Sequence, residues 1–367
     1  MQKQVTLLIL GCLFIPFSHA ADFTPAKPMP SVPLADGHLV TRIAFGSCGI
    51  PTNDDSIYDE IRKTNADVFL FIGDNVYSAD ESDDPELKSL KVAYGKFAES
   101  SAFASLRANI PTLVTWDDHD YGLNDAGGDW PHKALSQSLF NFVWAVDDDE
   151  LRAIRDGVYF SRTVGPENRR VQFILLDTRY FRTPLKKAVK ALSGGGSYIP
   201  TRSTSQNMLG DAQWQWLEQQ LRQPADVRII ATSIQMIADG HNWEAWRLMP
   251  RERLRFYKLL GETGAKGVVL ISGDRHMAAI YRQTNNMAYP LWEVTSSSLN
   301  LPLSSFLSNI KTEPGPYRIG QPYYDANFGV IDIDWASRRL ILQIRDESGR
   351  AVLAANVSLE SLGVEKQ

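Results

Sequence analysis

Val68-Phe69-Leu70-Phe71-Ile72-Gly73-Asp74 is the stretch of sequence from which the fold can be worked out. Its first five residues are a continuous apolar run, which is typical of a strand buried on both faces of a sheet. Longer amphipathic stretches separate this run from similar ones at 39–45, 112–116, 171–176, 227–232 and 268–272. This alternation, followed by further strands, predicts a single α/β domain with a mixed sheet.

The C-terminal part of the chain has a different pattern. Successive strands are predicted at 292–297, 328–335, 340–345 and 351–358. They predict a second sheet that contains antiparallel pairs. The clearest helix is predicted earlier, at 211–222, where Trp214, Leu217 and Leu221 fall on one face and Asp211 is the expected N-cap.

The first residues have the features of a secretory signal. Lys3 supplies a positive charge, residues 5–17 are apolar, and cleavage is expected after Ala20. The apolar run is shorter than the roughly 20 residues of a membrane span, so no integral membrane anchor is expected, although an uncleaved anchor is an alternative. We therefore expect a periplasmic or secreted protein. Its predicted parts are a signal peptide at 1–20, a Pro-rich linker at 21–37 and one domain at 38–362.

The composition limits the classes of partner. The chain of 367 residues has a formal net charge of −5 and no block of five or more like charges. A broad basic surface is therefore missing, and stable binding of nucleic acid is not expected. Removal of the signal would also remove Cys12 and leave Cys48 as the only cysteine. Cys48 is then a core residue, a metal ligand or a nucleophile.

Polar residues that can bind metals follow four of the predicted strands, where open α/β sheets place their sites. One Gly-Asp pair alone is more often a simple turn, and a surface turn would screen clustered charges. Away from such a surface turn, the three carboxylates of residues 117–120 would repel one another unless cations were present. Together the four strand ends favour a metal site. They are Gly46-Ser47-Cys48-Gly49, Gly73-Asp74-Asn75-Val76-Tyr77, Asp117-Asp118-His119-Asp120 and Gly273-Asp274-Arg275-His276.

Three further segments accompany these strand ends: Leu176-Asp177-Thr178-Arg179, Leu209-Gly210-Asp211-Ala212-Gln213-Trp214 and Ser233-Ile234-Gln235. Taken together, the seven segments resemble the PhoD-type alkaline phosphatase and phosphodiesterase family, within the calcineurin-like metallophosphoesterase fold. The resemblance implies a four-layer αββα sandwich of two mixed β-sheets flanked by helices. It also implies a hydrolase that acts on phosphoric ester bonds of a small substrate, either a monoester or a diester. We expect the protein to be a monomer.

The resemblance also implies which residues bind metals. A ferric ion would be bound or approached by residues of the first, second and last strand ends, with calcium alongside. These residues are Cys48, Asp74, Tyr77, Asp274 and His276. Two further metal-ligand candidates are Asp118, which stands where the wider superfamily has an Asn before its His, and Asn124, which resembles an Asn of the family that binds calcium. Gln235 stands where the wider superfamily has its middle histidine, and it is a poorer ligand.

The chemistry of these residues supports the same set. Thiolate, phenolate and imidazole suit a transition metal such as Fe3+, whereas carboxylate and amide oxygens suit Ca2+. Asp74 could bridge two cations, which would lower the pKa of a bound water to give the hydroxide that attacks phosphorus. His119 is a candidate to protonate the leaving oxygen or to bond the phosphoryl group. Arg179 and Arg275 are candidates to clamp the substrate anion, or else structural ion-pair partners.

Two other functions are alternatives. Gly46-Ser47-Cys48 is similar to the nucleophile segment of papain-type cysteine hydrolases, with His119 or His276 as the base. A papain-type cysteine begins a helix, however, whereas Cys48 follows a predicted strand. The second alternative is a non-catalytic protein that binds a metal or a phosphate ester. The sequence contains neither a Walker A segment nor a Gly-x-Ser-x-Gly elbow.

Overall fold

The computed structural model describes residues 22–78, 84–190, 192, 195–285, 287–305, 307 and 314–365. The predicted signal peptide at 1–20 lies outside these residues. Within the described part of the chain, no helix is long and apolar enough to cross a membrane.

The first sheet, sheet A, has the strand order β13-β12-β11-β1-β2-β3. Its strands β1, β2 and β3 are parallel, and β11 pairs antiparallel with β1 and continues into an antiparallel β12 and β13. The bounds are β1 Arg42–Gly46, β2 Val68–Ile72, β3 Thr112–Thr115, β11 Asn327–Asp334, β12 Arg339–Asp346 and β13 Ala351–Ser358.

The second sheet, sheet B, has the order β10-β8-β9-β7-β6-β5-β4. Its centre, β5, β6, β7 and β9, is parallel, and β4, β8 and β10 are antiparallel to their neighbours. The bounds are β4 Phe160–Val164, β5 Val171–Leu175, β6 Val227–Ala231, β7 Val268–Ser272, β8 Ala278–Gln283, β9 Leu291–Ser296 and β10 Arg318–Tyr323. Both sheets are mixed, as the sequence predicts.

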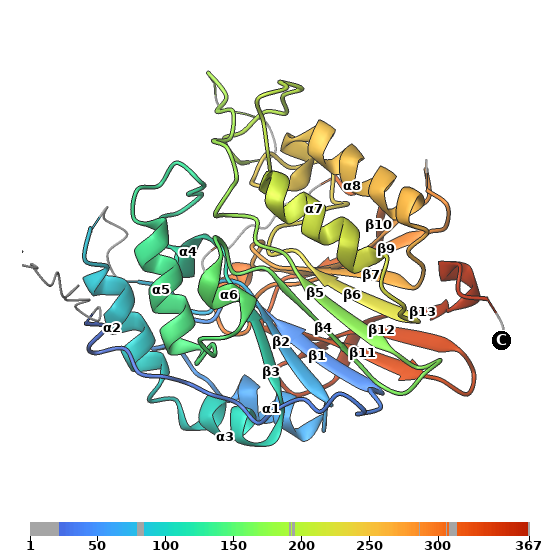
Figure 1. The fold of residues 1–367 in the computed structure, drawn as a ribbon, viewed down its shortest axis with the longest axis horizontal. Helices are drawn as coiled ribbons and strands as arrows, with labels where there is room; N and C mark the ends of the chain where they lie inside the picture. The colour runs from blue at the N-terminus through green and yellow to red at the C-terminus, as the bar shows by residue number, and fades with distance from the viewer. Residues whose placement is uncertain are drawn as a thin grey trace, which may run out of the picture.

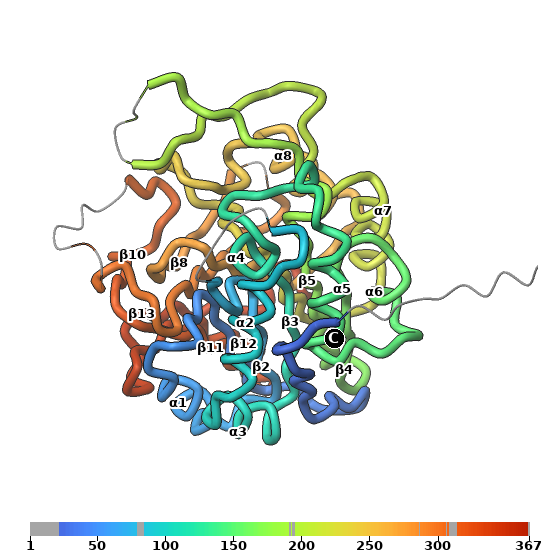
Figure 2. The backbone as a smooth tube through the Cα atoms, turned by 90° about the vertical axis from the view of Figure 1, so that its left-hand side faces the viewer, coloured from blue at the N-terminus to red at the C-terminus, as the bar shows by residue number. Residues whose placement is uncertain are grey.

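Helices cover the outer face of each sheet, which gives four layers (Figure 1). Sheet A is covered by α1, α2, α3 and α5, and sheet B by α7 and α8. In Figure 2, α8 and the pair α1 and α3 lie at opposite ends, with strands between them. The helix bounds are α1 Ile57–Lys63, α2 Lys88–Phe97, α3 Ser101–Asn109, α4 Asp118–Tyr121, α5 Lys133–Val143, α6 Leu151–Ile154, α7 Gly210–Leu221 and α8 Pro250–Thr263, with short 3-10 turns η1 Trp246–Leu248, η2 Leu303–Ser305 and η3 Glu360–Leu362.

The apolar strands serve two cores at once because successive side chains point to opposite faces. In β5, Phe173 and Leu175 point into the core between the sheets, whereas Ile174 packs under α7 and α8. In β2, Leu70 points into the same inter-sheet core and Phe71 packs under the helices of sheet A. This explains why these strands are apolar throughout, and it confirms the predicted αββα sandwich.

Three local predictions need correction. The four C-terminal strands do not form one sheet, because β9 belongs to sheet B while β11, β12 and β13 extend sheet A. The helix predicted from Asp211 begins at Gly210, and Asp211 makes no cap. The Gly210 N–H is instead bonded to Oδ1 of Asn207 at 2.7 Å.

The third correction concerns residues 22–37, predicted to be a linker. They contain no helix or strand, but they pack on the domain. Met29 is 1% exposed and its N–H donates to the Val143 carbonyl at 2.7 Å. Arg107 Nη1 donates to the Pro30 carbonyl at 2.6 Å. The packed part of the chain therefore begins well before residue 38.

Candidate metal centre

The predicted site residues come from strand ends of both sheets, and the structure brings most of them together. The Cys48 thiol, after β1, donates to Asp74 Oδ2 at 3.3 Å. The Tyr77 hydroxyl donates to the same oxygen at 2.8 Å. Ser297 Oγ lies 3.1 Å from Cys48 Sγ and accepts the backbone N–H of His276 at 2.7 Å. One chain of contacts therefore links the first, second and last predicted segments.

The backbone at these strand ends adopts an unusual conformation. Cys48, Asp74, Asp274 and His276 have φ values of 61°, 50°, 69° and 52°. This left-handed region is uncommon for residues other than glycine and costs on the order of 1–3 kcal/mol each. Such residues persist only where the surrounding structure holds them, and they cluster at functional sites. Four such residues at the carboxyl ends of the strands indicate a functional site whose side chains are held in fixed positions by the backbone.

Glycine allows the loops of the two sheets to approach each other. A Cβ atom on Gly73, whose φ is 115°, would lie 2.7 Å from Asp117 Cβ and 3.1 Å from Ser233 Cβ. No real side chain tolerates the shorter contact, so only glycine permits Asp74 and Asp117 to lie in one cluster.

Four carboxylates meet at this edge. One oxygen from each of Asp74, Asp117, Asp118 and Asp274 lies within 4.8 Å of the others. The first three are 1–2% exposed. Among the described residues, Asp117 Oδ2 and Asp118 Oδ1 have no hydrogen-bond partner. Buried carboxylate oxygens without donors are costly, and cations would satisfy them.

The carboxylates of the cluster differ in the direction in which their pKa values are shifted. Burial, and then the charge of Asp118, raises the pKa of Asp74 to about 6. Burial also raises the pKa of Asp274 well above its usual range, with Asp118 and Glu244 adding to the effect. Burial alone would raise the pKa of Asp118 too, but the nearby charges of His119 and Arg179 outweigh it and lower the pKa. The cluster therefore favours any species that brings positive charge.

The two candidate histidines, His119 and His276, have different surroundings. His276 Nδ1 lies 2.8 Å from the Leu301 carbonyl, which can only accept, so Nδ1 carries the proton and Nε2 has the lone pair. Burial lowers the pKa of His276 to about 4, which keeps the ring neutral. His119 stacks on Tyr77 with ring centroids 4.1 Å apart, and its backbone N–H lies 3.4 Å from Asp74 Oδ1. A neutral imidazole is the form that binds metals.

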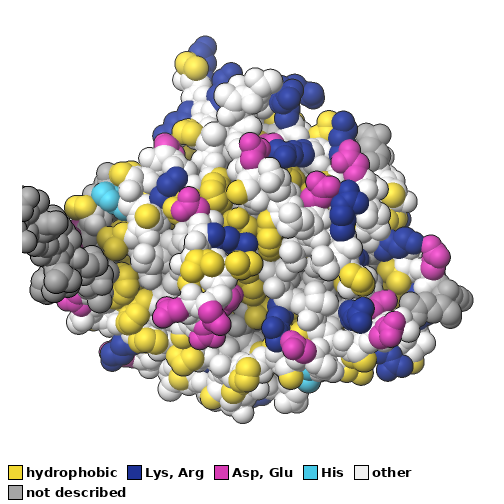
Figure 3. Space-filling model, in the orientation of Figure 1, with side chains coloured by type: hydrophobic (Ala, Val, Ile, Leu, Met, Phe, Trp, Pro, Cys, Tyr) yellow, Lys and Arg dark blue, Asp and Glu magenta, His cyan; other side chains and the backbone are white. Residues whose placement is uncertain are grey.

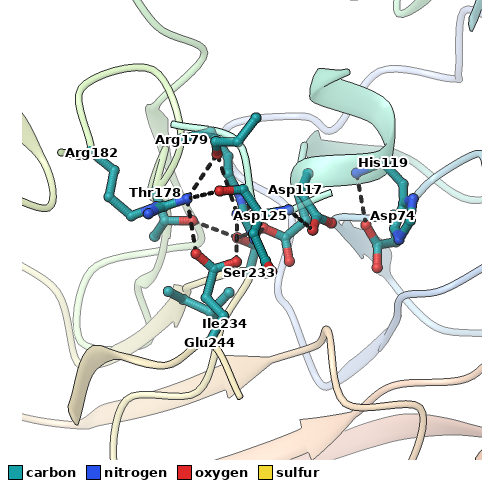
Figure 4. Close-up of polar contacts among 12 residues, drawn as sticks. Asp74, Asp117, His119, Asp125, Thr178, Arg179, Arg182, Ser233, Ile234 and Glu244 are labelled. Carbon is teal, nitrogen blue, oxygen red and sulfur yellow. Dashed lines mark hydrogen bonds and ion pairs between the residues drawn. The ribbon is translucent and has the colours of Figure 1, made fainter. Parts of the chain in front are cut away.

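Arg179 lies in a buried ion-pair network, drawn in Figure 4. Its Nε donates to Asp117 Oδ1 at 2.5 Å, and its Nη1 lies 2.5 Å from Glu244 Oε2. Arg182 Nη2 lies 3.0 Å from Glu244 Oε1. The side chains of both arginines are 0% exposed. This geometry favours the structural ion-pair role of Arg179 over the substrate clamp.

The other candidates lie near the edge of the cluster. Arg275 is 9% exposed, and its guanidinium carbon lies 5.6 Å from the ring centroid of Trp243. Asn124 is exposed and lines a hollow together with Asp125 and Tyr198. Asn124 therefore lies at the surface beside the cluster, whereas Asp118 lies within it.

The structure adds residues that were not predicted individually as ligands or catalytic groups. Asp117 joins the carboxylate cluster and accepts from Ser233 Oγ at 2.7 Å. Asp125 and Glu244 form a second acidic group with Asp118, again with ligand atoms within 4.8 Å. Glu244 could have been noticed in the sequence because it is a single acidic residue in the otherwise apolar stretch 243–246. A buried charge needs a partner of opposite charge.

Gln235 does not take the place of a ligand. Its Nε2 donates to Tyr281 Oη at 3.1 Å and to Thr295 Oγ1 at 2.9 Å. Its Oε1 lies 3.0 Å from Nε2 of His241. The Gln235 amide is thus hydrogen-bonded within sheet B.

The fold is shared with two solved structures. The chain is similar to the solved structure described as "Structure of PhoD", with a TM-score of 0.65 and 16% identity over 89% of this chain and 70% of that one. It is also similar to GAP50 of Plasmodium, described as the anchor in the inner membrane complex, with a TM-score of 0.53 and 12% identity over 90% of each chain. At these identities the likeness shows the fold alone.

The sequence establishes the family. The model of the PhoD-like phosphatase family matches residues 142–337, just over half of the chain, and the chain belongs to that family. The protein is therefore a hydrolase of phosphoric ester bonds, as the sequence predicted. No curated protein matches the sequence.

Proposed function

We propose that the protein is an exported, metal-dependent phosphoesterase that hydrolyses small phosphate monoesters or diesters. The observation that carries the proposal is the buried group of Asp74, Asp117, Asp118 and Asp274, with ligand atoms within 4.8 Å. Like charges so close, and shielded from water, require compensating positive charge. Arg179 supplies one such charge, which leaves an excess of acid that cations would balance.

The residues present fit two kinds of cation. A side with sulfur, phenol and imidazole donors, the ligand types that transition metals use, is offered by Cys48, Tyr77 and the His276 Nε2 lone pair. We propose Fe3+ as the cation on this side. A hard, oxygen-only side is offered by Asp118 with Asp274 or Asn124, which suits Ca2+. Asp74 belongs to both sides, because its carboxylate contacts the thiol and the phenol and also lies in the acidic cluster.

Bound cations would activate water and neutralise charge on the phosphoryl oxygens. The chain's own residues do the positioning. His119 is partly exposed and its ring lies against that of Tyr77. This position supports a role in giving a proton to the leaving oxygen or in bonding the phosphoryl group. Arg275 at the edge of the cluster is the better candidate to hold the substrate anion, since Arg179 is engaged by Asp117 and Glu244.

Two observations weigh against the cysteine hydrolase. Cys48 is 0% exposed, and burial, with the nearby charge of Asp74, raises the pKa of its thiol well above the usual value. A protonated, inaccessible thiol is a poor nucleophile. The assay below also tests the other alternative from the sequence, a protein that binds a metal or a phosphate ester without hydrolysing it.

The surface agrees with a small substrate. On the face drawn in Figure 3, lysine and arginine side chains are interspersed with aspartate and glutamate. Such a surface has no single-sign field to attract a polyanion. Export, with a signal at 1–20 and cleavage after Ala20, and a monomeric state complete the proposal; N-terminal sequencing and light scattering test them.

The test is hydrolysis of p-nitrophenyl phosphate and bis-p-nitrophenyl phosphate before and after chelation, with elemental analysis of the same sample. We expect activity on at least one ester, loss of activity with the chelator, and recovery with Fe3+ and Ca2+ together. His276→Ala should lose activity and one metal while keeping its fold, and exposed His38→Ala is the control. Activity that survives complete removal of metal would overturn the proposal, and metal binding without hydrolysis would favour the binding protein.

A further inference from the structure

Trp243 is an exposed aromatic residue next to the metal centre. Of the nine tryptophans of the chain, all within the described residues, it alone is exposed, at 46%. The next residue, Glu244, shares the second acidic group with Asp118. A large aromatic ring left in water beside a polar site calls for a reason, because aromatic rings are strongly stabilised by burial.

The ring of Trp243 is held by its surroundings although it is exposed. Gly195 lies against it, since a Cβ there would be 3.1 Å from Trp243 Nε1. Gly196 has a φ of 82°, and a Cβ there would lie 2.1 Å from the carbonyl carbon of Asn242. The Tyr198 N–H donates to the Asn242 carbonyl at 3.1 Å. The two glycines therefore allow this loop to support the ring from one side, which reduces its freedom before any ligand arrives.

The ring is also next to the residue that we expect to hold the substrate anion. The guanidinium carbon of Arg275 lies 5.6 Å from the ring centroid of Trp243. Arg275 follows Asp274 and precedes His276 in the chain, so the same strand end carries the ligands and the arginine. A phosphate ester held by its phosphoryl group at this strand end would extend its alcohol part over a short distance towards Trp243.

We propose that Trp243 is a specificity-determining residue that stacks on the alcohol part of the substrate, and that this part is a flat aromatic group. This inference rests on the proposed function, because it assigns the substrate class of the same site. A rigid ring face selects flat, polarisable partners over puckered rings and flexible chains, since only a flat group makes contact over its whole area. The substrates would thus be aryl or nucleoside-like phosphate esters.

The test compares phenyl phosphate with cyclohexyl phosphate, whose alcohol parts have equal numbers of ring carbons but differ in flatness. Both are measured as phosphate release by the metal-loaded enzyme, so that kcat/KM is obtained for each. Trp243→Ala should lower kcat/KM for phenyl phosphate by roughly three- to tenfold, the range expected for one aromatic pair. It should change kcat/KM for cyclohexyl phosphate by less than about twofold. Comparing the ratio of the two esters between variants removes their difference in intrinsic reactivity.

Two variants serve as controls. Trp243→Phe keeps a flat ring and should keep most of the preference for phenyl phosphate. Leu254→Ala removes a comparably exposed apolar side chain, 47% exposed on α8, and should change neither ester. Thermal unfolding of each variant checks that the fold is intact, and if Trp243→Ala does not fold, Trp243→Leu replaces it.

The dissociation constants of phenylphosphonate and cyclohexylphosphonate, measured by calorimetry, give a readout that does not need turnover. We expect Trp243→Ala to weaken binding of phenylphosphonate selectively. Equal losses for both rings, or no loss for either, would overturn the role of Trp243 and leave the proposed function intact. Absence of hydrolysis by the wild-type enzyme would overturn the proposed function, while the phosphonate measurements would still decide on Trp243.

Discussion

Replacing Asp74 by Asn should stabilise the metal-free protein and abolish its activity when metals are present. Asp74 is 1% exposed, and its pKa is raised from the usual 3.8 to about 6 by burial and by Asp118. At about 1.4 kcal/mol for each pH unit, this rise corresponds to about 3 kcal/mol of unfavourable free energy in the ionised folded state. Asn carries no charge, tolerates the φ of 50°, and can still accept from the Tyr77 hydroxyl.

The sign of the pH dependence follows from proton binding. Between pH 3.8 and about 6 the folded protein holds the Asp74 proton more tightly than the unfolded chain does. The contribution of Asp74 to the free energy of unfolding of the metal-free wild type should therefore fall by about 3 kcal/mol as the pH rises through this window. The Asp74→Asn variant should lack this loss, so the two proteins should differ by about 3 kcal/mol at pH 7 and by little below pH 3.8.

The assay is urea unfolding in the presence of a chelator at a series of pH values, repeated with metals added. Added metals should stabilise the wild type and not the variant, which should also fail to hydrolyse either nitrophenyl ester. Asp148→Asn, at an exposed carboxylate, is the matched control and should follow the wild type throughout. If metal-free Asp74→Asn were no more stable than the wild type at pH 7, the picture of a carboxylate cluster awaiting cations would be refuted.

Three further changes test other parts of the account. His119→Asn should lower kcat by about 10²–10⁴ with unchanged metal content; loss of metal from this variant would contradict its assignment as a proton donor. Arg179→Met removes the arginine partner of Asp117 and one of the two arginine partners of Glu244. It should lower the free energy of unfolding in urea by about 3–5 kcal/mol; wild-type stability with a raised KM would instead indicate a substrate clamp. Asp67 is half-buried, and although burial raises its pKa, hydrogen bonds from Thr41 N and His38 outweigh this and lower the pKa. The stabilisation that ionised Asp67 gives the fold is therefore present above pH 3.8 and is lost as the pH falls through its folded pKa. Asp67→Asn should lower the free energy of unfolding by about 1–3 kcal/mol at pH 7, and by progressively less in acid. A difference between variant and wild type that stays constant down to pH 3 would show that the carboxylate charge is not the cause.

Strands buried on both faces were predictable because both sets of alternating side chains must be apolar, which gives a continuous apolar run in the sequence. The structure keeps β2, β5, β6 and β7 within one residue of their predicted ends. By contrast, β10 is an edge strand in which no residue is buried, and β4 is only partly buried, so neither carries a continuous apolar run. Pairing of β11 with β1 rather than with β9 depends on contacts between distant segments that no local pattern records.

The site was predictable to a similar degree. Candidate ligands directly after strands, such as Cys48 and Asp74, could be proposed from the sequence because parallel strands bring their carboxyl ends to one edge. Glu244 and Asp125 lie in loops, where position depends on tertiary packing, so the sequence alone did not assign them. The same limit applies to residues 22–37, whose proline content predicts an extended segment but not the surface on which it packs.

An anomalous difference map from crystals of the metal-loaded protein tests the central claim most directly. We predict a transition-metal peak within about 2–2.5 Å of Cys48 Sγ, an oxygen of Asp74 and His276 Nε2, and a second, lighter cation on the carboxylate side of Asp74. Peaks confined to other parts of the molecule, with Cys48 and His276 sharing no cation, would contradict the account.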